Sequence, residues 1–173
     1  MTKIKLQIKN RWTGEILFEY EKENNTIKDT VVEAVSRCAD LSGADLRFAD
    51  LSGADLRGAK NMPHIPIACP TDGAFVGWKK LNGMLVKLLI PEDARRCSAA
   101  GRKCRCDKAQ VLAITFFDGS DTGITEILNK SQKSELLYKV GEMVYPDSFD
   151  EDRWHECTKG IHFFIDKQEA IDY

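Results

Sequence analysis

The densest group of charged side chains that could bind a ligand lies between Arg95 and Lys108, where six cations accompany one anion. These cations surround the small residues 98–101 (Ser-Ala-Ala-Gly), where the backbone can approach a ligand and expose its N–H groups. Guanidinium groups form paired hydrogen bonds with phosphate and carboxylate, and lysine adds a compact positive charge. We therefore predict an anion site with Ser98 and Gly101 in its pocket. Its predicted ligands are Arg95, Arg96, Arg102, Lys103, Arg105 and Lys108. The alternative is a solvated basic loop that balances residues 109–173, which carry six cations and thirteen anions.

Thiols and imidazoles offer a second possible site. Cys104, Cys106, His155 and Cys157 could converge on a metal ion in the folded chain. Zinc ligands usually come in pairs about two to four residues apart, whereas a single residue separates Cys104 from Cys106. The alternation instead predicts a strand with these two cysteines facing the core and Lys103 and Arg105 on its other side. We therefore predict no metal site and no cofactor.

Residues 160–173 form a third group, with a glycine, an apolar strand around His162 and a short helix that Asp166 can cap. This order is similar to a strand and helix of ADP-ribosyltransferases, where a Gly-x-Tyr-Phe run precedes a helix with Ala and Tyr. The resemblance implies a nucleotide- or NAD-processing enzyme with His162 in its pocket, although that family has an aromatic residue there. Because His162 would face away from Ile161 and Phe163, a hydrogen-bonded structural histidine is the alternative. The chain carries no Gly-x-Ser-x-Gly, Walker or His-Glu-x-x-His motif, so we predict no catalytic residue.

A five-residue repeat starts at Ala39 and reads ADLSG, ADLRF, ADLSG and ADLRG, with a degraded fifth unit that ends at Pro63. On an α-helix a five-residue step turns the chain by about 140°, so the leucines would scatter around the helix. Within each unit, Ala and Leu are two residues apart with Asp between them, which is typical of extended backbone. We expect Ala and Leu to face inward and the aspartates to face solvent.

This repeat resembles the pentapeptide-repeat family. The resemblance implies a right-handed, four-sided β-helix in which four units complete one coil, so residues 39–63 make about one coil. Stacked repeats generally need about three units and end caps, so we expect the flanking segments to stabilise this coil. The family's long members resemble rods of duplex DNA, but one coil offers no rod-length surface. Nucleic acid is therefore a possible partner that the sequence does not favour.

The flanking segments predict the elements that position these groups. Alternating apolar residues before and after the turn-like NRWTGE predict a β-hairpin, and a helix capped by Asn25 or Thr26 follows it. Strand-like runs over 74–78, 84–90, 111–117, 136–140 and 161–165 precede a final helix over 167–173. The predicted fold class is α+β, with an antiparallel-rich C-terminal domain. The predicted parts are a ββα cap (1–38), the coil (39–63), a proline-rich linker (64–71) and the C-terminal α+β domain (72–173).

The order of these parts resembles short phage and prophage pentapeptide-repeat proteins with an uncharacterised C-terminal domain. That resemblance implies a non-enzymatic protein that sequesters or inhibits a host protein, or binds a nucleotide or other phosphate-bearing ligand. The alternatives are the ADP-ribosyltransferase-like enzyme and a structural or assembly protein, with homodimerisation through the open end of the coil. No stretch has the roughly 18 apolar residues of a membrane span, and the six cysteines lack an export signal. We therefore expect reduced thiols, no membrane partner and a cytoplasmic location in a bacterial host cell.

Overall fold

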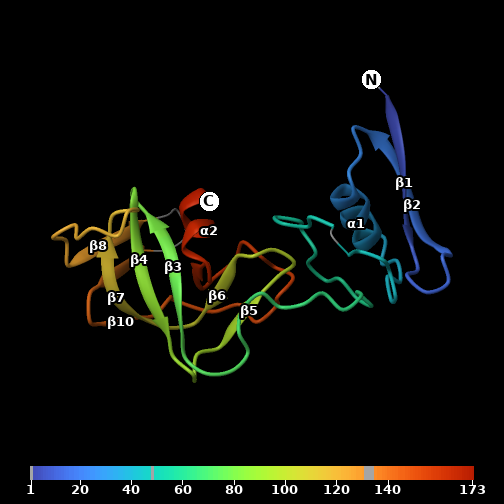
Figure 1. Cartoon of the computed structure of the whole chain (residues 1–173). Helices are drawn as coiled ribbons and strands as arrows, with labels where there is room; N and C mark the ends of the chain where they lie inside the picture. Colours follow the sequence, from blue (N-terminus) through green and yellow to red (C-terminus); the bar gives the residue numbers. More distant parts are fainter. Residues whose placement is uncertain (1, 48, 131–134) are drawn as a thin grey trace. The chain divides into compact units, whose positions relative to one another are not determined.

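The computed structural model of this chain describes residues 2–47, 49–130 and 135–173 (Figure 1). These residues divide into two compact units, residues 1–66 with 154–156 (unit 1) and residues 67–153 with 157–173 (unit 2). Unit 1 contains β1 (Lys3–Lys9), β2 (Ile16–Glu23) and α1 (Ile27–Ser36). Unit 2 contains β3 (Phe75–Leu81), β4 (Met84–Ile90), β5 (Arg96–Ser98), β6 (Cys104–Cys106), β7 (Ala109–Thr115), β8 (Glu126–Lys130), β9 (Glu135–Lys139), β10 (Met143–Val144), β11 (Ile161–Phe163) and α2 (Lys167–Asp172). The fold is mixed, with mostly antiparallel sheets and few helices, as the sequence predicts.

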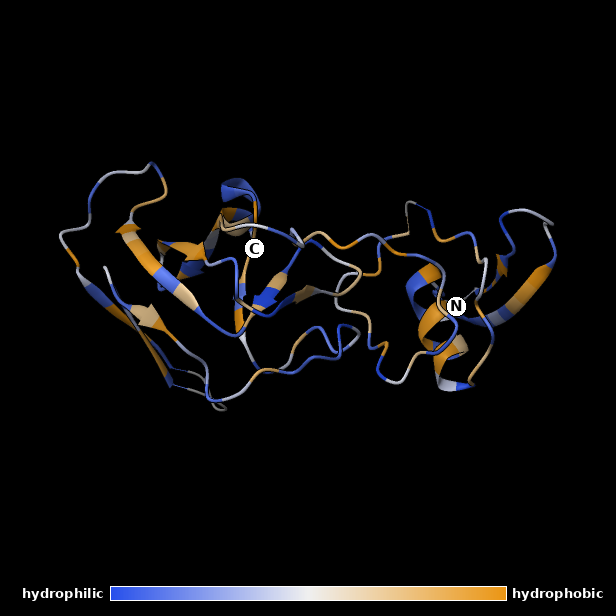
Figure 2. Ribbon diagram, turned by 90° about the horizontal axis from the view of Figure 1, so that it is seen from below, coloured by the Kyte–Doolittle hydropathy of each residue, from blue (hydrophilic) through white to orange (hydrophobic). Residues whose placement is uncertain are grey.

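Unit 1 begins with the predicted hairpin and helix. β1 and β2 pair antiparallel, and α1 packs against both strands. Thr26 is the N-cap of α1: its side chain accepts from the Asp29 backbone N–H, and the Asp29 carboxylate accepts from that of Thr26. This reciprocal capping box satisfies donors that the first turn would otherwise leave unpaired. Figure 2 shows hydrophobic and hydrophilic bands on α1, because one face is buried through Val31 and Ala34.

The repeat segment places its apolar residues inward, as predicted. Leu41 and Leu56 are buried, and the aspartates of all four units face solvent. In each unit the alanine N–H that follows donates to the leucine carbonyl three residues earlier, as from Ala44 to Leu41 at 2.9 Å. The described residues of this segment form turns and one isolated bridge, between Asn10 and Ala44. The four-sided β-helix therefore remains a prediction.

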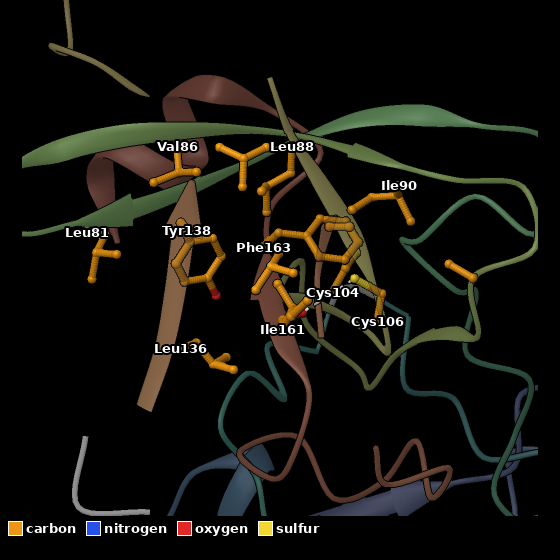
Figure 3. Packing of buried hydrophobic residues seen from close by; sticks show 14 of the residues in the cluster. Leu81, Val86, Leu88, Ile90, Cys104, Cys106, Leu136, Tyr138, Ile161 and Phe163 are labelled. Carbon is orange, nitrogen blue, oxygen red and sulfur yellow. Dashed lines mark hydrogen bonds between the residues drawn. The ribbon is translucent and has the colours of Figure 1, made fainter. Parts of the chain in front are cut away.

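Unit 2 is built on a four-stranded antiparallel sheet with the order β10-β7-β4-β3. Its core (Figure 3) packs Val86 and Leu88 of β4 against Tyr138 of β9 and Phe163 of β11. Gly77 of β3 lies against the Phe163 ring, where a Cβ atom would come within 2.6 Å of the ring carbon Cδ2. The sheet can therefore approach β11 only because this position lacks a side chain.

The boundary between the two units, at residues 66 and 67, lies within the predicted linker. The sequence misses three short strands, β5, β8 and β10, because none of them has a long alternating run. The predicted strand over 111–117 begins at Ala109 and ends at Thr115, since the Phe116 N–H donates to the Ser120 carbonyl in a tight turn. The four-part domain division remains a prediction. Among the described residues, neither helix has the length and apolar character needed to cross a bilayer.

Candidate functional site

The predicted basic site lies on the hairpin of β5 and β6, in a three-stranded sheet with the order β11-β6-β5. Ser98 lies opposite Cys104, so residues 99–103 form the connecting loop. Arg153 holds the start of this loop: its Nε donates to the Ser98 carbonyl at 3.1 Å and its Nη2 to the Ala99 carbonyl at 2.8 Å. The loop backbone is therefore fixed by a side chain that is distant in sequence.

Arg95 and Lys108, two of the six predicted cations, are held by carboxylates of their own unit. Arg95 contacts Asp107 at 2.8 Å and Glu151 at 2.7 Å. Lys108 contacts Asp93 at 2.6 Å, and this hydrogen bond lowers the pKa of the Asp93 carboxyl. An incoming anion would have to displace two carboxylates from Arg95, and the Lys108 side chain is only 22% exposed, so both are poorly prepared to bind one.

Arg96 donates to backbone carbonyls of its own unit. Its Nε donates to Ala94 at 3.1 Å, its Nη1 to Gly73 at 2.7 Å, and its Nη2 to Pro91 at 3.3 Å. The guanidinium therefore joins the chain before β3 to the turn that follows β4. In this position it acts as a structural crosslink.

Arg105 is buried, with 3% of its surface exposed. Cys104 and Cys106 are buried, as predicted. The opposite side of β6 is covered as well, so Arg105 does not face solvent as the alternation would suggest. The physical reason is that other residues surround its guanidinium group. The Phe149 ring lies 5.6 Å from the guanidinium carbon. The Nη2 atom donates to the Asp152 carbonyl at 2.9 Å and to Cys97 Sγ at 3.1 Å.

Arg102 and Lys103 remain as the cations that the loop presents. The Arg102 side chain is 62% exposed, and its Nε donates to Glu169 of α2 at 2.7 Å. Lys103 Nζ donates to Cys157 Sγ and to Tyr173 Oη, each at 3.2 Å, and lies 5.2 Å from the Tyr173 ring centre. Within the described parts of the chain, Lys103 has no carboxylate at ion-pair distance.

Positive charge accumulates around Lys103. Burial lowers the pKa of Lys79 to about 8, and the charge of Lys103 contributes to this shift. Burial also lowers the pKa of His162 to about 4, and the charges of Lys103, Lys79 and Arg105 add to that effect. Lys79 Nζ donates to the His162 carbonyl at 3.3 Å, which places these groups in one region. Lys103 therefore raises the cost of charging Lys79 and His162, so an anion would be favoured here.

The predicted pocket residues make internal hydrogen bonds. Ser98 Oγ accepts from the backbone N–H groups of Ala68 and Cys69 at 2.9 and 3.4 Å. His162 Nε2 lies 2.7 Å from the Thr158 carbonyl, as expected for a structural histidine. Gly101 lies in the loop between β5 and β6. A ligand pocket that includes these residues remains a prediction.

The sulfur atoms do not converge into a metal site in the described residues. No group of three or more His, Cys, Asp or Glu side chains there has the arrangement to hold an ion. Cys104 and Cys106 are buried, and burial raises the pKa of the Cys106 thiol. Cys157 is exposed beside Lys103. The buried thiols therefore act as apolar core residues.

The structure also has an open concavity of about 470 Å³, and none of its lining residues belongs to the basic loop. It lies beside the second half of β7 and the segment that follows, with Leu112, Ile124 and Val140 among its apolar residues and Asp121 as its charged one. It contains none of the predicted cations. Nothing in its lining resembles the chemistry expected for an anion.

Sequence inspection missed Lys79, Arg153 and Glu169. A signal for Lys79 exists, because alternation along β3 puts it on the core side with Phe75 and Leu81. Arg153 and Glu169 carry no comparable signal, since their roles depend on partners more than fifty residues away.

Comparison with known proteins gives two family matches. Residues 65–170 match the family described as "Family of unknown function (DUF5758)", which covers more than half of the chain. Residues 37–60 match "Pentapeptide repeats (8 copies)". No curated protein and no solved structure matches the chain.

Proposed function

Because this chain belongs to the family of unknown function DUF5758 and carries pentapeptide repeats, we propose that it is a non-enzymatic binding protein for an anionic partner. The repeat match favours a repeat protein without catalytic activity. Unit 2 would supply the binding surface through the loop that presents Arg102 and Lys103. The ligand chemistry is a phosphate group, either on a nucleotide or on a modified host protein.

The observation that supports this proposal best is the position of Lys103. Its ammonium group donates to Cys157 Sγ and Tyr173 Oη, and neither of these acceptors is a carboxylate. Burial lowers the pKa values of Lys79 and His162, and the charge of Lys103 adds to both shifts, as expected where a positive charge lacks a counterion. A phosphate group would supply that counterion, and the planar guanidinium of Arg102 could bind it through two hydrogen bonds.

Arg102 would change partners on binding. In the free protein its Nε donates to Glu169, a carboxylate whose Oε2 is buried without a hydrogen-bond partner. A surface ion pair of this kind contributes little to stability, so a doubly charged phosphate could replace the carboxylate. Glu169 therefore occupies the place where an anion would bind.

For unit 1 we propose that the repeat segment completes about one coil of a right-handed, four-sided β-helix. The alanine-to-leucine hydrogen bond that recurs in the four units supports this, as does the hydrogen bond from Ser42 Oγ to the Asn61 carbonyl, nineteen residues later, at 3.5 Å. A coil of four five-residue units brings residues about twenty apart together. The hairpin and α1 would then cap the coil, because the Arg11 N–H donates to the Gly43 carbonyl at 2.8 Å. The resemblance to phage proteins favours a partner in a bacterial host cell.

The test of the binding function is calorimetric titration of the full chain with inorganic pyrophosphate and with ADP. We expect saturable binding that the Arg102→Glu/Lys103→Glu double variant loses by at least tenfold, with no fall in melting temperature. The matched control is Lys3→Glu/Lys9→Glu, which makes the same change in net charge at exposed positions of β1.

Three outcomes would contradict the proposal. Binding that the control weakens as much as the double variant would reflect net charge alone. No binding of either probe would remove the phosphate class, and turnover of ADP would favour an enzyme instead of a binding protein.

A further inference from the structure

The solvent face of the β8–β9 hairpin carries an ordered pattern of charges and leucines. In the antiparallel register, Glu126 lies opposite Lys139, Leu128 opposite Leu137, and Lys130 opposite Glu135. All six side chains are exposed, whereas Ile127, Leu136 and Tyr138 on the other face are buried in the core. The solvent face thus consists of one apolar pair between two pairs of opposite charge.

The two leucines are unusually accessible for paired strand residues. Leu128 is 40% exposed and Leu137 is 50% exposed. In the described residues, β8 has only β9 as a strand neighbour, so its other edge can accept a further strand. The Leu128 carbonyl accepts one long hydrogen bond, 3.5 Å from Asn82 Nδ2, which a backbone N–H of an incoming strand could replace.

The sequence of β8, Glu-Ile-Leu-Asn-Lys, complements itself when two copies run antiparallel about Leu128. Glu126 of one copy then lies opposite Lys130 of the other at both ends of the pair, and the two Leu128 side chains meet at the centre. A parallel pair in register would instead set Glu126 against Glu126 and Lys130 against Lys130. Cross-strand pairs of opposite charge are favourable and pairs of like charge are unfavourable, so the antiparallel arrangement is selected.

We propose that β8 is a self-association edge, through which two copies of this chain form a symmetric dimer with a four-stranded sheet, β9-β8-β8-β9. Each charged row of that sheet alternates in sign, from Lys139 through Glu126 to Lys130 and Glu135 of the second copy. The middle row contains four leucines, and at its centre the two Leu128 side chains shield part of each other's exposed surface. This two-fold arrangement uses the same patch on both copies, as a closed dimer requires.

The charges within the hairpin are consistent with this geometry. Lys130 Nζ lies 3.7 Å from Glu135, and Lys139 Nζ lies 2.5 Å from Glu142. The Lys130–Glu135 pair of this face is therefore already formed, whereas Lys139 pairs with a carboxylate beyond the end of β9. Two five-residue strands make a small interface, so the dimer should form reversibly and depend on protein concentration.

The test is sedimentation velocity of the full chain over a concentration series. Wild-type protein should shift from one chain to two as concentration rises to roughly 1 mM, the upper range of weak association. Glu126→Lys gives a chain with two lysines on this edge, and Lys130→Glu gives one with two glutamates. Each variant alone should dimerise at least tenfold more weakly than wild type.

Mixing the two variants is the decisive step, because the two lysines of the Glu126→Lys chain would face the two glutamates of the Lys130→Glu chain. We expect the equimolar mixture to recover wild-type dimerisation or exceed it. Glu21→Lys, at an exposed position of β2, is the matched control and should leave association unchanged. Circular dichroism of each variant should show the wild-type fold.

Three results would overturn the proposal: wild-type protein that stays monomeric throughout the series, single variants that dimerise normally, or a mixture that does not recover. Dimerisation that survives both single variants would indicate a different interface, such as the open end of the repeat segment.

Discussion

The repeat segment and the basic segment contain the same kinds of charged residue but neutralise them differently. In the repeat, Arg47 pairs with Asp45 and Arg57 with Asp55, two residues earlier in each case. In the basic segment, Arg102 pairs with Glu169, sixty-seven residues away. Local pairs are a property of the repeat unit, whereas distant pairs depend on how unit 2 folds.

This difference decides which charges are available to a partner. Each arginine of the repeat keeps its carboxylate whatever the rest of the chain does, and the pKa of Asp45 falls to about 2 because Arg47 donates to it. In the basic segment the fold supplies the counterions, and it supplies none for Lys103 within the described residues. The charged residues of the repeat therefore suit a structural role, whereas Lys103 in the loop suits the binding of an anion.

The largest expected effect comes from the apolar side of the repeat. Leu41→Ala removes a fully buried side chain, and we expect it to lower the free energy of unfolding of unit 1 by about 3 kcal/mol. Urea unfolding followed by the NMR signals of α1 measures this change. Leu46→Ala, at a half-buried position of the same repeat, is the control and should cost clearly less. Equal losses would mean that the leucines are not distinguished by burial.

Arg105→Met tests the structural role of the buried arginine in the basic segment. The Asp152 carbonyl would lose a charged donor, so we expect a loss of about 3 kcal/mol in the stability of unit 2. Thermal unfolding of the full chain measures it. Arg57→Met, the control in the repeat, should leave the melting temperature unchanged, because its pair with Asp55 is exposed. An unchanged melting temperature for Arg105→Met would show that Arg105, like Arg57, contributes little to stability.

The pH dependence of unit 2 should report on His162. Burial lowers its pKa in the folded state from 6.5 to about 4, so the unfolded state binds a proton first as the pH falls. Its contribution to stability is complete above pH 6.5 and is lost on acidification toward pH 4, by roughly 3 kcal/mol. Urea titrations at pH 7, 5.5 and 4.5 measure the loss, and His162→Gln should reduce the slope. An unchanged slope would mean that other groups control this range.

The smallest effect concerns the carboxylate beside Arg102. Glu169→Gln removes the negative charge that competes with a ligand, so pyrophosphate should bind a few-fold more tightly, as expected for an exposed ion pair. Calorimetry of the variant and of the wild-type chain measures the difference. Unchanged or weaker binding would show that Arg102 does not exchange Glu169 for the anion.

Much of the fold follows from local sequence. Thr26 and Asp29 form a capping box that their spacing indicates, and Asp166 caps α2 by accepting from Gln168 and Glu169. The inward orientation of the repeat leucines could be predicted, because every unit has the same Ala-Asp-Leu alternation. β5 and β8 could not be found this way, because strands of three and five residues are too short to show a clear alternation, although each pairs with the next strand in the sequence.

The candidate site was only partly visible in the sequence, because its side chains bind partners that lie far away along the chain. The cluster of cations is evident between Arg95 and Lys108, but their fates differ. Arg105 is buried and Arg96 binds backbone carbonyls, and neither outcome follows from residue type or spacing. Lys103 differs from its neighbours only through Cys157 and Tyr173, which the fold brings from the end of the chain.

An NMR titration of the full chain with inorganic pyrophosphate tests the central claim most directly. We expect saturable shifts in the backbone amides of residues 99–106 and in α2, where Glu169 would release Arg102, with no shifts near Arg47 and Arg57. Shifts confined to the repeat segment, or none in the loop at saturating pyrophosphate, would contradict the assignment of anion binding to Arg102 and Lys103.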